Sequence, residues 1–135
     1  MSSTLTRMNP DTLPDAGKVG YSQMTVTAPG RLAFVSGQVA QSADGAPVPA
    51  TLEGQTDQVV ANLGAALEAL GVGPQEIVQM RIYMTDLNDE AQTVVMSRIA
   101  AFLDGARPSL TGIGVAALAG SDLRVEVEMV VQFPT

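Results

Sequence analysis

The fold of this chain is decided near its C-terminus, by the stretch RPSLTGIGVAAL at residues 107–118 and the stretch LRVEVEMV at residues 123–130. Charged and apolar residues alternate in the second stretch, which is the pattern of a half-buried β-strand. Small and apolar residues dominate the first stretch, and Gly120-Ser121-Asp122 separates the two. We therefore predict strands over residues 111–118 and 123–132, joined by that short turn.

Three segments upstream also carry strand patterns. Residues 22–27 and 32–36 flank Pro29-Gly30 and predict a hairpin. Residues 77–84, IVQMRIYM, alternate with a period of two, so that Arg81 and Tyr83 share one face of the predicted strand. The apolar residues predicted to share its other face are Val78, Met80, Ile82 and Met84.

Two further segments carry the period of an amphipathic helix. Apolar residues form one stripe between residues 53 and 70, and Gly71 supplies a stop. A second helix is predicted to begin within residues 86–90, where several side chains can act as N-caps, and to end at Asp104-Gly105.

The order of these elements is strand, strand, helix, strand, helix, strand, strand. It predicts a single α+β domain over residues 1–135, a two-layer sandwich with two helices on one face of a mixed sheet. The other face of the sheet would be open in a monomer. Because Met24, Phe34 and Val130 are expected there, we predict that further copies of the chain cover it.

Composition excludes several classes of function. The 135 residues include no cysteine and no histidine, which rules out disulfides, Cys nucleophiles, Ser-His triads and His/Cys zinc sites. A net charge of -7 without any Lys/Arg cluster argues against nucleic-acid binding. No apolar run is long enough to span a bilayer and the N-terminus has no signal pattern, so we expect a cytoplasmic protein with no membrane contact.

One short motif imitates a nucleotide site. Residues 112–117, GIGVAA, fit the string of the dinucleotide fingerprint. That site needs a helix that opens within the motif, whereas a strand is predicted to run through these residues. Nucleotide binding is therefore not expected.

An ordered set of motifs resembles a known family. Besides the C-terminal stretches, the set comprises GYSQ at 20–23, AFVSGQ at 33–38, the helix at 55–71 and YMTDLND at 83–89. It resembles the Rid (YjgF-type) family of small imine and enamine deaminases, and covers nearly the whole chain. The resemblance implies a chorismate-mutase-like fold and a homotrimer whose sheets form a central barrel. It also implies small-molecule clefts between subunits and chemistry that needs neither a metal nor an organic cofactor.

The resemblance assigns roles residue by residue. Tyr21 corresponds to the tyrosine that lines the family's cleft, and the backbone of Gly37 and that of Gly112 would face the ligand. Glu126 corresponds to the glutamate that orients water in catalytic members. Leu110 stands where those members carry the arginine that clamps a substrate carboxylate, and no cleft asparagine occurs near residues 94–96.

Leu110 decides how much of the family's deaminase reaction can be expected of this chain. A guanidinium pairs with a carboxylate through two hydrogen bonds, and losing both would weaken an imino-acid complex by roughly two orders of magnitude or more. Arg81 is expected to share a polar face with Glu126 and Glu128. It is either a substitute anchor or a structural ion-pair partner of one of these glutamates.

Structural roles compete with the functional ones at the other positions. Glu126 and Glu128 follow a period of two that also suits a solvated or interface face. The Tyr21 ring could simply pack, and Gly37 could merely permit the end of a strand. Three functions remain open: an imine or enamine deaminase with an atypical substrate, a noncatalytic metabolite-binding protein, and a hydrolase with different chemistry.

Overall fold

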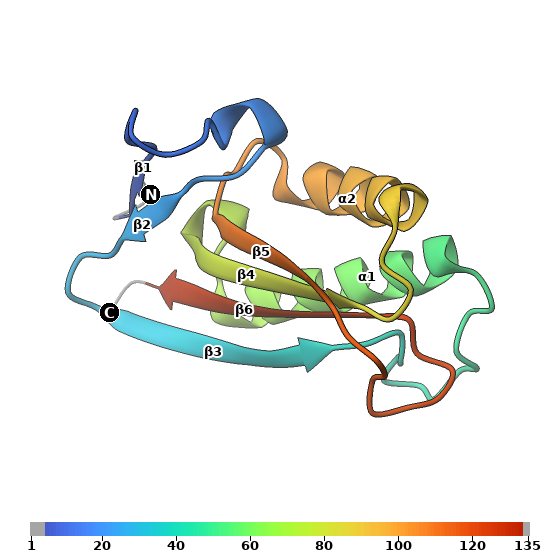
Figure 1. The fold of residues 1–135 in the computed structure, drawn as a ribbon. Coiled ribbons are helices and arrows are strands. Elements are labelled where there is room, and N and C mark those ends of the chain that lie inside the picture. Colours follow the sequence, from blue (N-terminus) through green and yellow to red (C-terminus); the bar gives the residue numbers. More distant parts are fainter. Residues whose placement is uncertain (1–4, 134–135) are drawn as a thin grey trace.

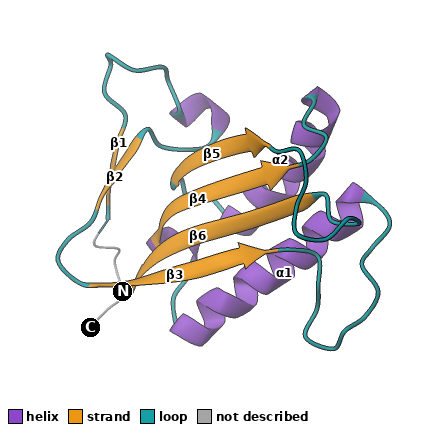
Figure 2. Cartoon of the chain, turned by 60° about the horizontal axis from the view of Figure 1, so that its bottom comes forward, coloured by secondary structure: helices purple, strands orange, loops and turns teal. Residues whose placement is uncertain are grey.

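Two helices lie on one face of a four-stranded sheet in the computed structural model, which describes residues 5–133 (Figures 1 and 2). The helices are α1 (Leu52–Leu70) and α2 (Asp89–Leu103), and the sheet has the order β3 (Arg31–Gln38), β6 (Val125–Phe133), β4 (Ile77–Met84), β5 (Ser109–Gly114). β6 runs antiparallel to β3 and β4, whereas β5 runs parallel to β4. The predicted α+β sandwich with a mixed sheet is thereby confirmed.

The predicted N-terminal hairpin is wrong. β2 (Met24–Val26) pairs with β1 (Thr6–Met8), a strand that the sequence patterns did not reveal, and β3 pairs with β6 instead. The connection at Gly30 is tied to the far end of the chain, because the Gln132 amide donates to the Ala28 carbonyl at 2.6 Å. Pairing with β6 gives β3 a neighbour along most of its length, which a short hairpin with β2 would not.

The two C-terminal strands are also arranged differently from the prediction. The turn at residues 120–122 does not join neighbouring strands, because β4 lies between β5 and β6. β5 ends at Gly114 rather than at residue 118, and residues 115–124 cross the end of the sheet. Parallel neighbours need a long connection, and α2 provides it between β4 and β5.

The core lies between the sheet and the helices. On the central strands, fully or almost fully buried side chains alternate with partly exposed ones, and this places eight residues on the helix face: Ile77, Met80, Ile82, Met84, Val125, Val127, Met129 and Val131. Val78 is not among them. A bulge at Ile77 to Gln79 makes Val78 an extra residue in the ladder. Ile77 therefore takes the buried position that was predicted for Val78.

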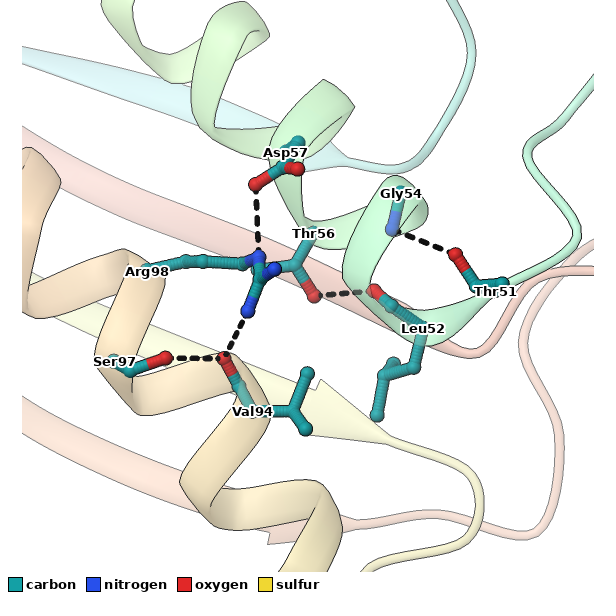
Figure 3. A network of polar contacts seen from close by, with 8 residues as sticks. All are labelled: Thr51, Leu52, Gly54, Thr56, Asp57, Val94, Ser97 and Arg98. Carbon is teal, nitrogen blue, oxygen red and sulfur yellow. Dashed lines mark hydrogen bonds and ion pairs between the residues drawn. The ribbon is translucent and has the colours of Figure 1, made fainter.

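Side-chain caps begin both helices and an ion pair links them, and Figure 3 shows the cap of α1 and the ion pair. The Thr51 hydroxyl accepts from the Gly54 N–H at 3.0 Å, and Asn88 caps α2 in the same way through the Ala91 N–H. Arg98 of α2 donates to the Asp57 carboxylate of α1 at 2.9 Å. No helix within residues 5–133 is both long and apolar enough to cross a membrane.

The opposite face of the sheet carries exposed apolar side chains. Phe34 is 76% exposed and Leu32 is 42% exposed, and Val130 pairs with Phe34 across the strands. Met24 is 39% exposed as well, but it belongs to the two-stranded sheet rather than to this face. We call the surface formed by Leu32, Phe34 and Val130 the apolar face.

Candidate functional site

The Glu126 carboxylate lies directly over Gly37. Glu126 projects from β6 on the side away from the helices, and Gly37 lies in the bulged end of β3 beside it. A Cβ added at Gly37 would come within 2.6 Å of the Glu126 carboxyl carbon, much closer than atoms can approach. Only glycine at position 37 therefore leaves room for this carboxylate.

A second polar group lies beside Glu126 on the same face. Arg81 is the cross-strand partner of Glu128, and its Nη1 lies 3.5 Å from Glu128 Oε1. The Tyr83 hydroxyl donates a hydrogen bond to the same carboxylate oxygen. This bond favours the protonated phenol and raises the pKa of Tyr83, with desolvation a smaller cause. The ion pair with a glutamate that was considered for Arg81 is present, and its role as a substitute anchor stays a prediction.

Leu110 and Gly112 lie on β5, at the other edge of the sheet. Leu110 pairs with Met80 and packs its half-buried side chain against the core, on the helix side. The Val115 N–H donates to the Met84 carbonyl, and because strand N–H groups alternate in direction, that of Gly112 points away from β4. Among the described residues β5 is an edge strand, so this N–H faces an open edge.

Tyr21 lies near the beginning of β5. The next residue, Ser22, is bound there by two hydrogen bonds, from its N–H to the Pro108 carbonyl at 3.1 Å and from its hydroxyl to the Arg107 carbonyl at 2.6 Å. The Tyr21 side chain is half-buried. It therefore belongs to the β5 side of the molecule and not to the side that holds Glu126.

One chain does not bring the whole set of sequence-predicted residues together. Gly37 and Glu126 meet at the β3 edge, whereas Tyr21, Leu110 and Gly112 lie at the β5 edge. The two edges are three strand spacings apart, or roughly 14 Å. Arg81 lies between them on β4, paired with Glu128.

Tyr83 is a polar member of this face to which no role was assigned from the sequence. The alternation of residues 77–84 placed it on the polar face, yet its partner depends on the register of β4 against β6. That register puts Tyr83 opposite Glu126 and diagonal to Glu128. Within residues 5–133, no three His, Cys, Asp or Glu side chains form a group that could hold a metal ion.

Comparisons with known proteins cover almost the whole chain. Residues 14–133 match the model of the family Ribonuc_L-PSP, described as Endoribonuclease L-PSP. The RutC family protein YjgH of Escherichia coli K12 is 33% identical over 98 residues, which are 73% of this chain and 74% of that protein. The RutC family protein slr0709 of Synechocystis is 32% identical over 120 residues, covering 87% and 89%.

A solved structure agrees with these sequence matches. YyfB from Yersinia pestis, described as a protein of unknown function of the conserved Rid family, is 32% identical to this chain. The two superpose with a TM-score of 0.89 over 96% of this chain and 99% of YyfB. The chain therefore belongs to the Ribonuc_L-PSP family, also called the YjgF or Rid family.

Proposed function

We propose that this protein is a homotrimer that binds a small metabolite in clefts between subunits and hydrolyses an imine or enamine there. One observation carries the proposal: the residues that correspond to the family's cleft are divided between the β3 edge and the β5 edge of one sheet. Residues at opposite edges of a sheet can meet only when the β5 edge of one copy adjoins the β3 edge of the next.

The apolar face supports the oligomer. Phe34, Leu32 and Val130 form an exposed surface on the side of the sheet that no helix covers. Exposed contiguous apolar surface of this kind is typical of a protein interface. A closed ring of three sheets would bury these side chains and bring the edge strands of neighbouring copies together.

The proposed reaction needs one water molecule and no added cofactor. Glu126 accepts a hydrogen bond from the water and takes its proton as the oxygen adds to the carbon of the C=N bond. Glu126 returns that proton to the nitrogen, which gives the neutral aminol. The aminol hydroxyl then gives up its own proton to Glu126, which passes it to the nitrogen as the C–N bond breaks, so that a carbonyl compound and ammonia are released. The outward N–H of Gly112 and the backbone at Gly37 hold the substrate.

Leu110 defines the substrate class. Its apolar side chain offers no partner to a carboxylate, and Arg81 is already paired with Glu128. The substrate therefore carries an uncharged or apolar group where a 2-imino acid carries its carboxylate. RNA cleavage, to which the family's description refers, is not proposed, because a net charge of -7 opposes binding to phosphates.

A noncatalytic metabolite-binding role is the second candidate. The same observation at Leu110 favours it, since the loss of a cationic anchor removes a group that holds substrate during the reaction. Ligand-induced stabilisation without turnover identifies this role.

The test compares imines that differ in one group. An amine oxidase generates imines without a carboxylate in situ, an amino-acid oxidase generates 2-iminopropionate, and ammonia release is measured above the uncatalysed rate. We expect the wild type to accelerate the first reaction, Glu126→Gln to lose that activity, and Leu110→Arg to gain activity toward 2-iminopropionate. Efficient wild-type turnover of 2-iminopropionate, with no gain from the arginine, would contradict the role given to Leu110.

A further inference from the structure

Within residues 5–133 the Arg124 guanidinium has no ion-pair or hydrogen-bond partner, in a chain that has twice as many acidic as basic side chains. The sequence has 14 Asp and Glu side chains against 7 Lys and Arg side chains. Two ion pairs occur within residues 5–133, Arg81 with Glu128 and Arg98 with Asp57. The Arg124 guanidinium takes part in neither, and no hydrogen bond from it is found in this part of the chain.

The backbone of Arg124 is fixed from both sides. Its N–H donates to the Gln55 side chain at 2.9 Å, and its carbonyl accepts from the Thr85 N–H at 3.1 Å. Gln55 is only 1% exposed, and its amide nitrogen donates to the carbonyls of Asp122 and Pro49. Two of the three hydrogen bonds of this buried side chain go to the loop that carries Arg124, and they fix the backbone from which the Arg124 side chain starts.

Arg124 lines a hollow of about 420 Å³ at the end of the sheet, where residues 115–124 cross it. This volume lies within the range of about 300–1,000 Å³ that small-molecule sites occupy. One part of the wall is apolar and comes from Ala116, Ala117 and Leu118. Asp86 and Asp122 are acidic members of the same wall. Neither Glu126 nor Gly37 contributes to it.

The charges of this wall select a ligand class. A simple anion would be attracted by Arg124 and repelled by Asp86 and Asp122. A simple amine would be attracted by the two aspartates and repelled by Arg124. A molecule that carries both a carboxylate and an ammonium group satisfies both signs. An aliphatic remainder would suit the Ala116 to Leu118 part of the wall.

We propose that this hollow is a second binding site, for a small zwitterion such as a free α-amino acid with an aliphatic side chain. Its carboxylate pairs with the Arg124 guanidinium, and its ammonium group lies toward Asp86 and Asp122. The residues that line this hollow include neither Gly37 nor Glu126 of the cleft proposed above. The proposal for the hollow does not depend on whether that cleft is catalytic.

Calorimetric titration of the full chain with L-leucine tests the site. The matched probes are 3-methylbutylamine, which lacks the carboxylate, and 4-methylpentanoate, which lacks the amine. We expect saturable binding of L-leucine and binding at least roughly tenfold weaker for either probe. Absence of L-leucine binding, or equal affinity for 4-methylpentanoate, would overturn the proposal.

Variants locate the bound molecule. Arg124→Gln keeps the backbone bonds to Gln55 and Thr85 and should weaken L-leucine binding at least roughly tenfold. Arg98→Gln makes the same charge change on α2 and should leave the affinity unchanged. Glu126→Gln should also leave it unchanged. If instead Glu126→Gln abolishes binding while Arg124→Gln does not, the ligand occupies the cleft and the second site is refuted.

Discussion

A methyl group at position 37 would overlap the Glu126 carboxylate, because its Cβ would lie 2.6 Å from the carboxyl carbon. We predict that Gly37→Ala displaces this carboxylate and lowers imine hydrolysis by roughly 100-fold, the scale of a lost general base. Because the carboxylate is the far end of a flexible side chain that can turn aside, the free energy of unfolding should fall by less than about 1 kcal/mol. Ammonia release and urea unfolding measure the two effects.

Gly73→Ala is the matched control, since nothing lies within 4 Å of the added carbon and Gly73 has no part in the proposed site. Its free energy of unfolding should stay within about 0.5 kcal/mol of the wild type. An equal loss of imine hydrolysis in the two variants would show that the contact between Gly37 and Glu126 does not matter for activity.

The hydrogen bond from Tyr83 to Glu128 makes a prediction about pH. In Tyr21→Phe the only remaining phenol is Tyr83, and we expect its absorbance titration to have a midpoint above the ordinary value of about 10. Adding Glu128→Leu removes the acceptor and should lower that midpoint. An unchanged midpoint in the double variant would contradict the bond.

The raised pKa also sets the sign of the stability change. The folded protein holds the phenolic proton to higher pH than the unfolded chain does. The contribution of Tyr83 is therefore fully present below about pH 10 and is lost as pH rises through the raised pKa. Urea unfolding on both sides of that pH should show a steeper loss of stability in Tyr21→Phe than in the variant that also lacks the Tyr83 hydroxyl.

Residue patterns revealed part of the site. The period of two placed Glu126, Glu128, Arg81 and Tyr83 on the face away from the helices, because alternation depends only on each strand's own sequence. The bond between Tyr83 and Glu128 could not be predicted in this way. It depends on the register of β4 against β6, which the sequence of neither strand contains.

At the scale of elements, Gln55 joins α1 to the loop that leads into β6. It is 1% exposed, and its side chain makes three hydrogen bonds to backbone groups of residues 49, 122 and 124. Gln55→Met keeps most of the volume and leaves these groups without their partner. We predict a loss of at least about 1–3 kcal/mol in the free energy of unfolding, measured in urea.

Gln58→Met is the control on the same helix. The Gln58 amide donates only to the Asn62 side chain one turn away. Such a bond stabilises a helix by about 0.2–0.5 kcal/mol. A loss as large as that of Gln55→Met would show that the change to methionine, rather than the link to the loop, sets the cost.

The helices were easier to predict than the strand pairings. Helix limits are set locally. Thr51 and Asn88 begin their helices and Gly71 ends α1 through contacts within a few residues. Strand pairing is not local, so the β1–β2 pair and the insertion of β4 between β5 and β6 were missed. The bulge at Val78 likewise arises from its fit to β6.

At the scale of the whole molecule, the apolar face should hold the oligomer together. Phe34 is its most exposed member at 76%, and Phe34→Glu would place a charge in the buried interface of each copy. We predict that this variant sediments as a monomer, whereas the wild type sediments as a trimer. Ala101→Glu, on an exposed position of α2 in the other layer, should leave the trimer intact.

The division of the site between two edges was not visible in the sequence. The family resemblance assigned roles to Gly37, Glu126, Leu110 and Gly112, but their places follow from the strand order β3-β6-β4-β5. That order separates the β3 and β5 edges by roughly 14 Å. The proposed cleft therefore requires two copies of the chain, and this requirement can be tested by mixing chains.

Subunit complementation tests that requirement most directly. Glu126→Gln damages the β3 side of each cleft, and Gly112→Pro removes the outward N–H on the β5 side, where an edge strand tolerates proline. Each variant alone should be inactive in ammonia release from imines that lack a carboxylate. Trimers reassembled from an equal mixture should regain about a quarter of wild-type activity, because a quarter of the clefts then combine two intact edges. Mixed trimers that remain inactive, while the wild type treated in the same way is active, would contradict a site shared between subunits.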